Sequence, residues 1–388
     1  MANTLKFGNG NWATKEGSTL AYNDENGNFK PLPFDFSRAS KATVINKDGL
    51  IEEVGSGEPR IDFKDDTKGA LLLEPQRTNL LIHSNDFSQS EWNKQAIGTA
   101  SLPVVTSNYG ISPDGTQNAD RVQLNLNGGT SGSDISFIGD YLTTISSATS
   151  GSFYLKSLDG IKNVRIRNGN AILNVDVTTQ WSRFVVTDET SSNKLQVMLY
   201  GNSNSQSADL LIYGAQIEEG SYATSYIPTS GSAVTRLADA CSQTPPDGVI
   251  GQTEGTMFCE ISEESLQENS RYMSISVFND PNKRITIYQS GGLINVYCSA
   301  GATFNFQYNP PDGRLKIAVG YKSGQYVLYV NGINAATSTE SAVVACSDLG
   351  LGVNEYLGTA NPPSVGYSQV VLYNTRLSNS ELAALTQV

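Results

Sequence analysis

Short runs in which hydrophobic and polar residues alternate recur along most of the chain. Runs of this kind, bounded by Gly, Asn, Asp and Ser, are typical of β-strands joined by tight turns. Near the N-terminus they are LKFG, STLAYNDENGNFKPLPFDFS and TVINKDGLIEEV, in which DENGN and NKDG are expected turns. The pattern predicts an all-β protein, and the spacing of its strands favours β-sandwiches over βαβ units.

The runs fall into three blocks. Residues 1–84 form a β-rich region, 85–232 contain enough short strands for a jelly roll, and 255–388 contain enough for a second sandwich. Between the last two blocks, 233–254 are rich in small residues and prolines and are expected to be a linker. One helix is expected, in SNSELAALTQV at the C-terminus, because Ser378 and Glu381 have the spacing of a capping box.

A charged pair stands among leucines in ALLLEPQRTNLLIHSNDF, residues 70–87. If this segment crosses an apolar junction, its carboxylate needs a partner, since an unpaired buried charge costs several kcal/mol. We therefore expect Glu74 to pair with Arg77, Arg38 or Arg60 and to lock the first domain to the second. A solvated turn between two strands is the alternative.

Composition narrows the functional classes. The 388 residues include 38% hydrophobic and only 16% charged residues, and the net charge is −12. A nucleic-acid partner is disfavoured because phosphate contacts need clustered Lys and Arg. The N-terminus lacks the pattern of a secretory signal, and no apolar run approaches the ~18 residues of a membrane span. We therefore expect a soluble cytosolic product without membrane insertion, or a chain whose natural N-terminus has been trimmed.

The cysteines have neither CxxC spacing nor a nearby histidine, which disfavours zinc. They are expected to be small buried hydrophobic residues rather than disulfides. The four positions are Cys241, Cys259, Cys298 and Cys346.

Three resemblances together cover nearly the whole chain. KIAVGYKSGQYVLYVNG, with LGLG and VVLYNTRLSNSELAALT, resembles the laminin-G-like or concanavalin-like lectin sandwich. NDFSQSEW, GSFYLKS, WSRF and LLIYGAQIEEGSYATSYIPT are similar to galactose-binding-like jelly rolls of the carbohydrate-binding-module type. FDFSRASKATVINKDGLIEEVGSGEPRIDF, followed by LLLEPQRTNLL, resembles the N-terminal region of tail-fibre and other appendage proteins of tailed bacteriophages, including crAss-like phages.

The resemblance implies a structural protein of the virion surface, a tail fibre or head fibre, made in the host cytoplasm and bound to other virion proteins. Such appendages attach at symmetric positions, so a homo-oligomer is expected, most simply a trimer with contacts in residues 1–84. Binding of host-surface glycans would serve adsorption. A glycan depolymerase and a bacterial lectin or adhesin are the alternatives.

The acidic residues do not favour the depolymerase. Glycosidases of the concanavalin-like type carry an ExDxxE pattern, which none of the acidic clusters Glu52-Glu53, Asp65-Asp66, Glu218-Glu219 and Glu260 with Glu263-Glu264 has. Adjacent acids in a strand point to opposite faces, so these are expected to be solvated charges. The single histidine, His83, has no serine or cysteine signature beside it. The loop 24–28 places its glycine wrongly for an EF-hand, so no metal or cofactor is expected.

Aromatic residues are the remaining functional signal. Sugar rings stack on aromatic faces, so Tyr272, Tyr288, Tyr297 and Tyr356 are candidate ligand contacts, although strand tyrosines commonly fill cores and sheet faces. Tyr288 and Tyr297 lie in neighbouring expected strands and could share a face. Trp92 and Trp181 are expected in the core.

Overall fold

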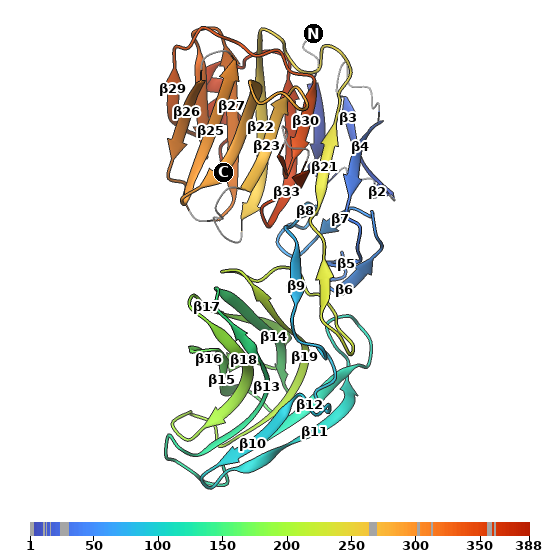
Figure 1. The fold of residues 1–388 in the computed structure, drawn as a ribbon, viewed down its shortest axis with the longest axis vertical. Coiled ribbons are helices and arrows are strands. Elements are labelled where there is room, and N and C mark those ends of the chain that lie inside the picture. Colours follow the sequence, from blue (N-terminus) through green and yellow to red (C-terminus); the bar gives the residue numbers. More distant parts are fainter. Residues whose placement is uncertain are drawn as a thin grey trace. The chain divides into compact units, whose positions relative to one another are not determined.

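The computed structural model describes residues 4–10, 12, 14–15, 17–23, 31–263, 270–300, 303–311, 313–354, 359–360 and 362–388. The chain divides into two compact units, each built of β-strands (Figure 1). Unit 1 comprises Met1–Gly49, Glu53–Gln76 and Leu237–Val388, and unit 2 comprises Leu50–Glu52 and Arg77–Arg236. This confirms the expected all-β fold with sandwich domains and one short C-terminal helix.

Two layers of strands form unit 1. The first layer runs, in order of pairing, through β26 Thr303–Tyr308, β25 Leu293–Ala300, β24 Lys283–Ser290, β23 Ser270–Ser276, β30 Asp348–Leu351, β21 Ala240–Gln243, β4 Pro31–Ser37 and β3 Ser18–Asn23. The second runs through β1 Thr4–Gly8, β33 Val365–Tyr373, β22 Glu254–Glu263, β27 Leu315–Lys322, β28 Tyr326–Val330 and β29 Ile333–Ser338. Short strands β2 Thr14–Lys15, β7 Arg60–Asp62 and β8 Ala70–Leu73 extend them, and β5 Ala42–Ile45, β6 Ile51–Val54, β31 Val353–Asn354 and β32 Thr359–Ala360 form two small hairpins.

The core of unit 1 lies between these layers. Alternate residues of the first layer, such as Ile285 and Ile287, meet residues of the second, such as Cys259 and Val319, and all four are fully buried. The second layer is apolar on its other face too, where Phe258 and neighbouring residues pack under the C-terminal helix. The outer face of the first layer is polar, as Thr286 on β24 and Asn295 on β25 show, since both alternate with core residues.

The described residues of 4–49 and 53–76 are built into this sandwich instead of forming a region of their own. β1 pairs with β33 along its whole length, β4 pairs with β21, and β8 pairs with the start of β33. Phe7, Phe34 and Leu71 are at most 1% exposed in the same core as the C-terminal strands. The structure thus divides the chain differently from the expected separate region 1–84, and the small core that motivated its role in oligomerisation is not observed.

The expected linker also differs. Within 233–254, β20 Val234–Arg236 pairs with β9 Arg77–Asn79 in unit 2, and β21 joins the first layer of unit 1. Val249 and Ile250 are buried in the core of unit 1. The small residues and prolines mark turns between paired strands in this segment.

Unit 2 is a sandwich of two five-stranded sheets, consistent with the expected jelly roll over 85–232. One sheet has the order β10 Asn93–Ile97, β13 Ile135–Ile145, β18 Ser192–Tyr200, β15 Lys162–Asn168 and β16 Ala171–Val177. The other has the order β11 Ser101–Gly110, β12 Ala119–Asn125, β19 Ser207–Glu219, β14 Thr149–Ser157 and β17 Ser182–Asp188. Trp92 is fully buried between them, with its ring 4.6 Å from that of Phe87. Trp181, expected in the core, is only half-buried and donates a hydrogen bond to the Ile111 carbonyl.

Local signals of the C-terminal half are confirmed. Helix α1, Asn379–Leu385, begins with the capping box of Ser378 and Glu381. The β28–β29 hairpin turns at Asn331 and Gly332, whose positive φ angles of 48° and 81° are those of a type I′ turn. The four cysteines are buried free thiols.

Among the described residues, no helix combines the length and hydropathy of a membrane span.

Glu74 belongs to a buried cluster of four charges inside unit 1. Arg60 donates to Glu74 over 2.7 Å and to Asp239 over 2.5 Å, and Arg38 donates to the other oxygen of Asp239 over 3.1 Å. All four side chains are at most 2% exposed. Burial alone would lower the pKa of Arg60, but the carboxylates of Asp239 and Glu74 raise it above its ordinary value.

This cluster contains one of the pairings expected for residues 70–87. Of the three proposed partners of Glu74, Arg60 binds it, and Arg38 binds Asp239. Arg77 belongs to unit 2, where it donates to the Tyr222 hydroxyl and lies 3.8 Å from the Glu218 carboxylate. The charges therefore join the N-terminal strands to residue 239 within unit 1.

Candidate functional site

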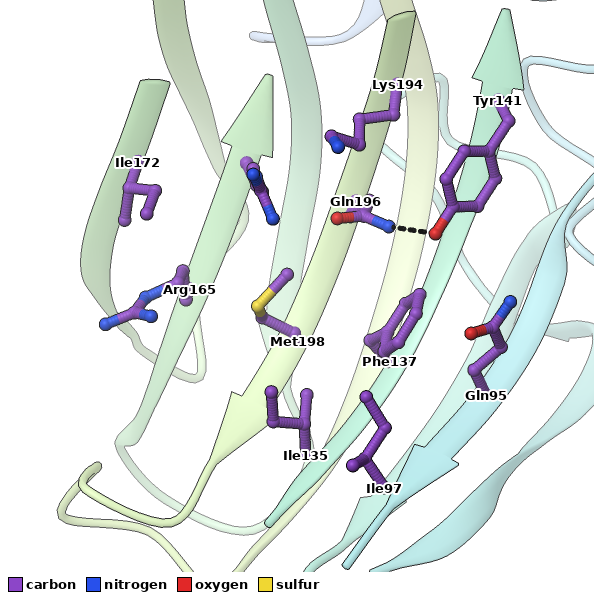
Figure 2. A pocket seen from close by; sticks show the side chains of 11 residues that line it. Gln95, Ile97, Ile135, Phe137, Tyr141, Arg165, Ile172, Lys194, Gln196 and Met198 are labelled. Carbon is purple, nitrogen blue, oxygen red and sulfur yellow. Dashed lines mark hydrogen bonds between the residues drawn. The ribbon is translucent and has the colours of Figure 1, made fainter. Parts of the chain in front are cut away.

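The candidate site is a groove on unit 2, with a volume of about 290 Å³. It lies on the outer face of the sheet β10-β13-β18-β15-β16, and each of these strands contributes side chains to it (Figure 2). Eleven residues line the groove: Gln95, Ile97, Ile135, Phe137, Tyr141, Arg165, Arg167, Ile172, Lys194, Gln196 and Met198.

Strand alternation explains how the sequence builds this face. Along β18, Leu195, Val197 and Leu199 point into the core, so Lys194, Gln196 and Met198 point outward. The register then fixes their neighbours, because residues directly opposite in an antiparallel pair share a face. Gln196 stands opposite both Arg167 and Gly139, and Met198 stands opposite both Arg165 and Phe137.

An amide and a phenol are coupled at the centre of the groove. Gln196 donates from Nε2 to the Tyr141 hydroxyl over 2.8 Å, as Figure 2 shows. Gly139 gives Gln196 room to lie across β13, because a Cβ at residue 139 would come within 2.5 Å of Gln196 Cγ. Tyr141 is 45% exposed as a residue, and its side chain lines the groove beside the hydrogen-bonded amide of Gln196.

The groove has a cationic side and an apolar side. Arg165 and Arg167 come from β15 and Lys194 from β18, whereas β10 and β13 supply Ile97, Ile135 and other apolar residues. Such a surface can stack on the apolar face of a small ring while it donates hydrogen bonds to the ring's polar edge.

The tyrosines expected to bind ligand lie on unit 1. Tyr288 stands opposite Asn295, and Tyr297 stands opposite Thr286, so the two tyrosines share the polar outer face of β24 and β25. Both are half-buried, and each has a guanidinium over one ring face: Arg271 is 4.9 Å from the centroid of Tyr288, and Arg284 is 4.7 Å from that of Tyr297. These stacked cations occupy ring surface that a sugar would use.

The other two tyrosines do not join this face. Tyr272 is fully buried in the core of unit 1, which corrects its assignment as a ligand contact. Tyr356 and the loop 24–28 lie outside the described residues.

Acidic residues are more buried than expected. Glu218 is fully buried and accepts hydrogen bonds from Gln216 and Thr224, while its neighbour Glu219 is exposed, so alternation holds but the expected solvation of both does not. Asp66 and Glu260 both bind Arg314.

The single histidine, His83, lies 4.0 Å from Glu91. Within the described ranges, no three His, Cys, Asp or Glu side chains are placed to hold a metal ion.

The groove was not predicted from the sequence, although the sequence contains a signal for it. NVRIRN places Arg165 and Arg167 two residues apart, and KLQVMLY places Lys194, Gln196 and Met198 in the same alternation. Each pattern puts its polar residues on one face of a strand. What the sequence does not contain is the pairing of β15 with β18, which brings the two sets together.

Comparisons with known proteins give structural likeness only. No family model and no curated protein matches the chain. Solved structures similar to it include the carbohydrate-binding module CBM40 of a Ruminococcus gnavus sialidase bound to α2,3-sialyllactose (20% identity, TM-score 0.32, 36% of this chain and 84% of that one) and domain 4 of AbnA, a GH43 extracellular arabinanase from Geobacillus stearothermophilus (19%, 0.33, 44% and 83%). Domains LG4-5 of the mouse laminin α1 chain are a further example (10%, 0.26, 66% and 90%). With TM-scores below 0.5, these likenesses assign no ligand and no activity to this chain.

Proposed function

We propose that this protein binds glycans without cleaving them, through the groove on unit 2. The observation that carries the proposal is the composition of that groove. Tyr141 and the amide of Gln196 that is hydrogen-bonded to it lie on one sheet face. The apolar residues of the groove and its three cationic residues lie on the same face. Saccharides present the same combination of apolar ring faces and polar edges.

A non-catalytic role is supported by the residues that line the groove. Glycosidases generally use a pair of carboxyl groups, one of which donates or accepts a proton. None of the eleven described groove residues is Asp or Glu. A binding site of this kind holds a sugar and provides no carboxyl group to protonate the leaving group.

The setting we propose is a surface appendage of a tailed-phage particle, a tail fibre or head fibre that contacts host-surface glycans. Support comes from the resemblance of residues 34–63 and 71–81 to phage appendage proteins. A homo-oligomer, most simply a trimer, fits this setting, because several weak sites held together bind more tightly than one. Mass spectrometry of purified virions tests this setting. Absence of the protein from the particles would favour a bacterial lectin or adhesin.

Glycan binding itself is tested on an array that covers neutral, uronate-containing, sialylated and sulfated glycans. The full-length protein should bind at least one class, with a single-site Kd of roughly 0.1 to 1 mM because a shallow site leaves little free energy after ordering costs. Tyr141→Ala should abolish binding, while a Tyr288→Ala/Tyr297→Ala variant should bind normally. Loss of binding only in the second variant would move the site to unit 1, and release of reducing ends from a bound glycan would favour a depolymerase.

A further inference from the structure

Positive charge is concentrated in the groove of an otherwise acidic protein. The chain has 26 Lys and Arg against 38 Asp and Glu, yet three of the eleven groove residues are cationic and none is acidic. Asp176 lies on the same face of β16 but outside the groove, where it accepts a hydrogen bond from Asn163 over 2.9 Å. The groove is therefore a local electropositive site.

Both arginines are held in place by contacts that leave their terminal nitrogens available. Arg165 donates from Nε to Asn174 over 2.9 Å, and its guanidinium carbon lies 3.8 Å from the centroid of the Tyr200 ring. Arg167 donates from Nε to the Gly169 carbonyl over 2.8 Å. No hydrogen bond within the described chain uses the Nη atoms of either residue. A guanidinium fixed in this way is suited to bind a carboxylate or sulfate with two parallel hydrogen bonds.

Lys194 and Arg167 are like charges placed near each other. Partial burial, and then the positive charge of Arg167, lower the pKa of Lys194 from its ordinary value. An anion bound beside the two side chains would remove this repulsion and would favour the charged form of the lysine. The arrangement is thus more favourable when an anion is present.

We infer that the groove binds an acidic saccharide, with its carboxylate or sulfate against Arg165, Arg167 and Lys194 and its ring over the apolar side formed by β10 and β13. The inference rests on the proposed function and specifies its ligand class. Charge complementarity selects the ligand here, and the apolar residues Ile97, Ile135 and Phe137 favour a sugar over a small inorganic anion, which has no apolar face to bury.

The test uses matched ligands that differ in charge. Isothermal titration of the full-length protein compares 3′-sialyllactose and 3′-sulfolactose with lactose, and trigalacturonate with its methyl ester. The acidic member of at least one set should bind at least about tenfold more tightly than its neutral counterpart, and higher salt should weaken its binding. The two lactose derivatives show whether carboxylate or sulfate is preferred.

Variants separate this inference from glycan binding as such. Arg167→Gln/Lys194→Gln should remove the preference for the acidic ligand, whereas Lys156→Gln, which removes a cation from β14 in the other sheet, should leave it unchanged. Both groove residues are half-buried at the surface, and Lys194→Gln alone gives a milder version should the double variant fail to fold. Neutral glycans that bind as well as acidic ones, with loss in Tyr141→Ala, would overturn the inference and leave the proposed function standing. Absence of binding to every ligand on the array would overturn both.

Discussion

Replacing Asp239 by Asn should destabilise unit 1 severely, because it unbalances the buried charge cluster. Asp239 accepts from Arg38 and Arg60 and also from the backbone N–H of Glu74, over 2.8 Å. The native cluster holds two guanidiniums and two carboxylates, so its formal charge is zero. Asparagine keeps the shape but leaves two buried cations with one anion.

The expected cost is about 3–5 kcal/mol, the range found when one partner of a buried ion pair is removed. Most of it comes from the uncompensated charge and less from the lost attraction. Asp239→Asn combined with Arg38→Met should therefore recover a large part of the stability, since Arg60 and Glu74 remain as a neutral pair. Glu53→Gln is the control, because the Lys41–Glu53 pair is 72% and 46% exposed, so solvent screens it and its loss should change the stability little.

Hydrogen exchange during urea unfolding, read by mass spectrometry of peptides, is the suitable assay because the two units need not unfold together. Peptides of β24 and β25 should show an unfolding midpoint lowered by roughly 1 to 2 M urea in Asp239→Asn. Peptides of unit 2 should be unchanged, since all four charges belong to unit 1. A shift no larger than that of Glu53→Gln, or no recovery in the double variant, would refute the reasoning.

Three further outcomes are expected. Burial raises the pKa of Asp140 to about 6, so the folded form binds a proton more tightly than the unfolded form, and this stabilisation is lost as pH rises from about 4 through 6. The stability of Asp140→Asn should therefore rise by about 2 kcal/mol relative to the native protein between pH 4.5 and 7.5, measured by denaturation at both pH values. Gly139→Ala should weaken glycan binding severalfold by displacing Gln196, with a melting temperature that changes less than in Asp239→Asn. Light scattering of the full chain should give the mass of an oligomer, and a monomer would contradict the proposed assembly.

Local chemistry made part of this fold predictable. The capping box of Ser378 and Glu381 and the Asn331-Gly332 turn depend on neighbouring residues, and the structure has both. The shared face of Tyr288 and Tyr297 follows from alternation along two strands joined by a short turn. In each case, the interacting groups are close in sequence.

Long-range pairing was not predictable in the same way. β1 and β33 lie at opposite ends of the chain, and a strand's hydrophobic pattern shows that it needs a partner without showing which one. Removal of residues 1–84 would accordingly take β1, β2, β3, β4, β5, β7 and β8 out of unit 1, so the loss of an oligomer in such a truncation would not locate its contacts. Asp239 was missed for the same reason, since its partners are far away in sequence.

The two polar sheet faces show why residue type alone is a weak guide to a binding site. On unit 1, the cations stack on Tyr288 and Tyr297, so aromatic and charged groups are paired with each other. On unit 2, the Tyr141 hydroxyl is bound by an amide, and the cations lie on other strands, with Arg165 stacked on a separate tyrosine. The same residue types therefore contact one another on the polar face of unit 1. On the groove face of unit 2 they leave hydrogen-bonding groups and aromatic surface available to a ligand. That difference depends on strand register, and it is the reason that the groove of unit 2, and not the tyrosines first expected, is the site to test.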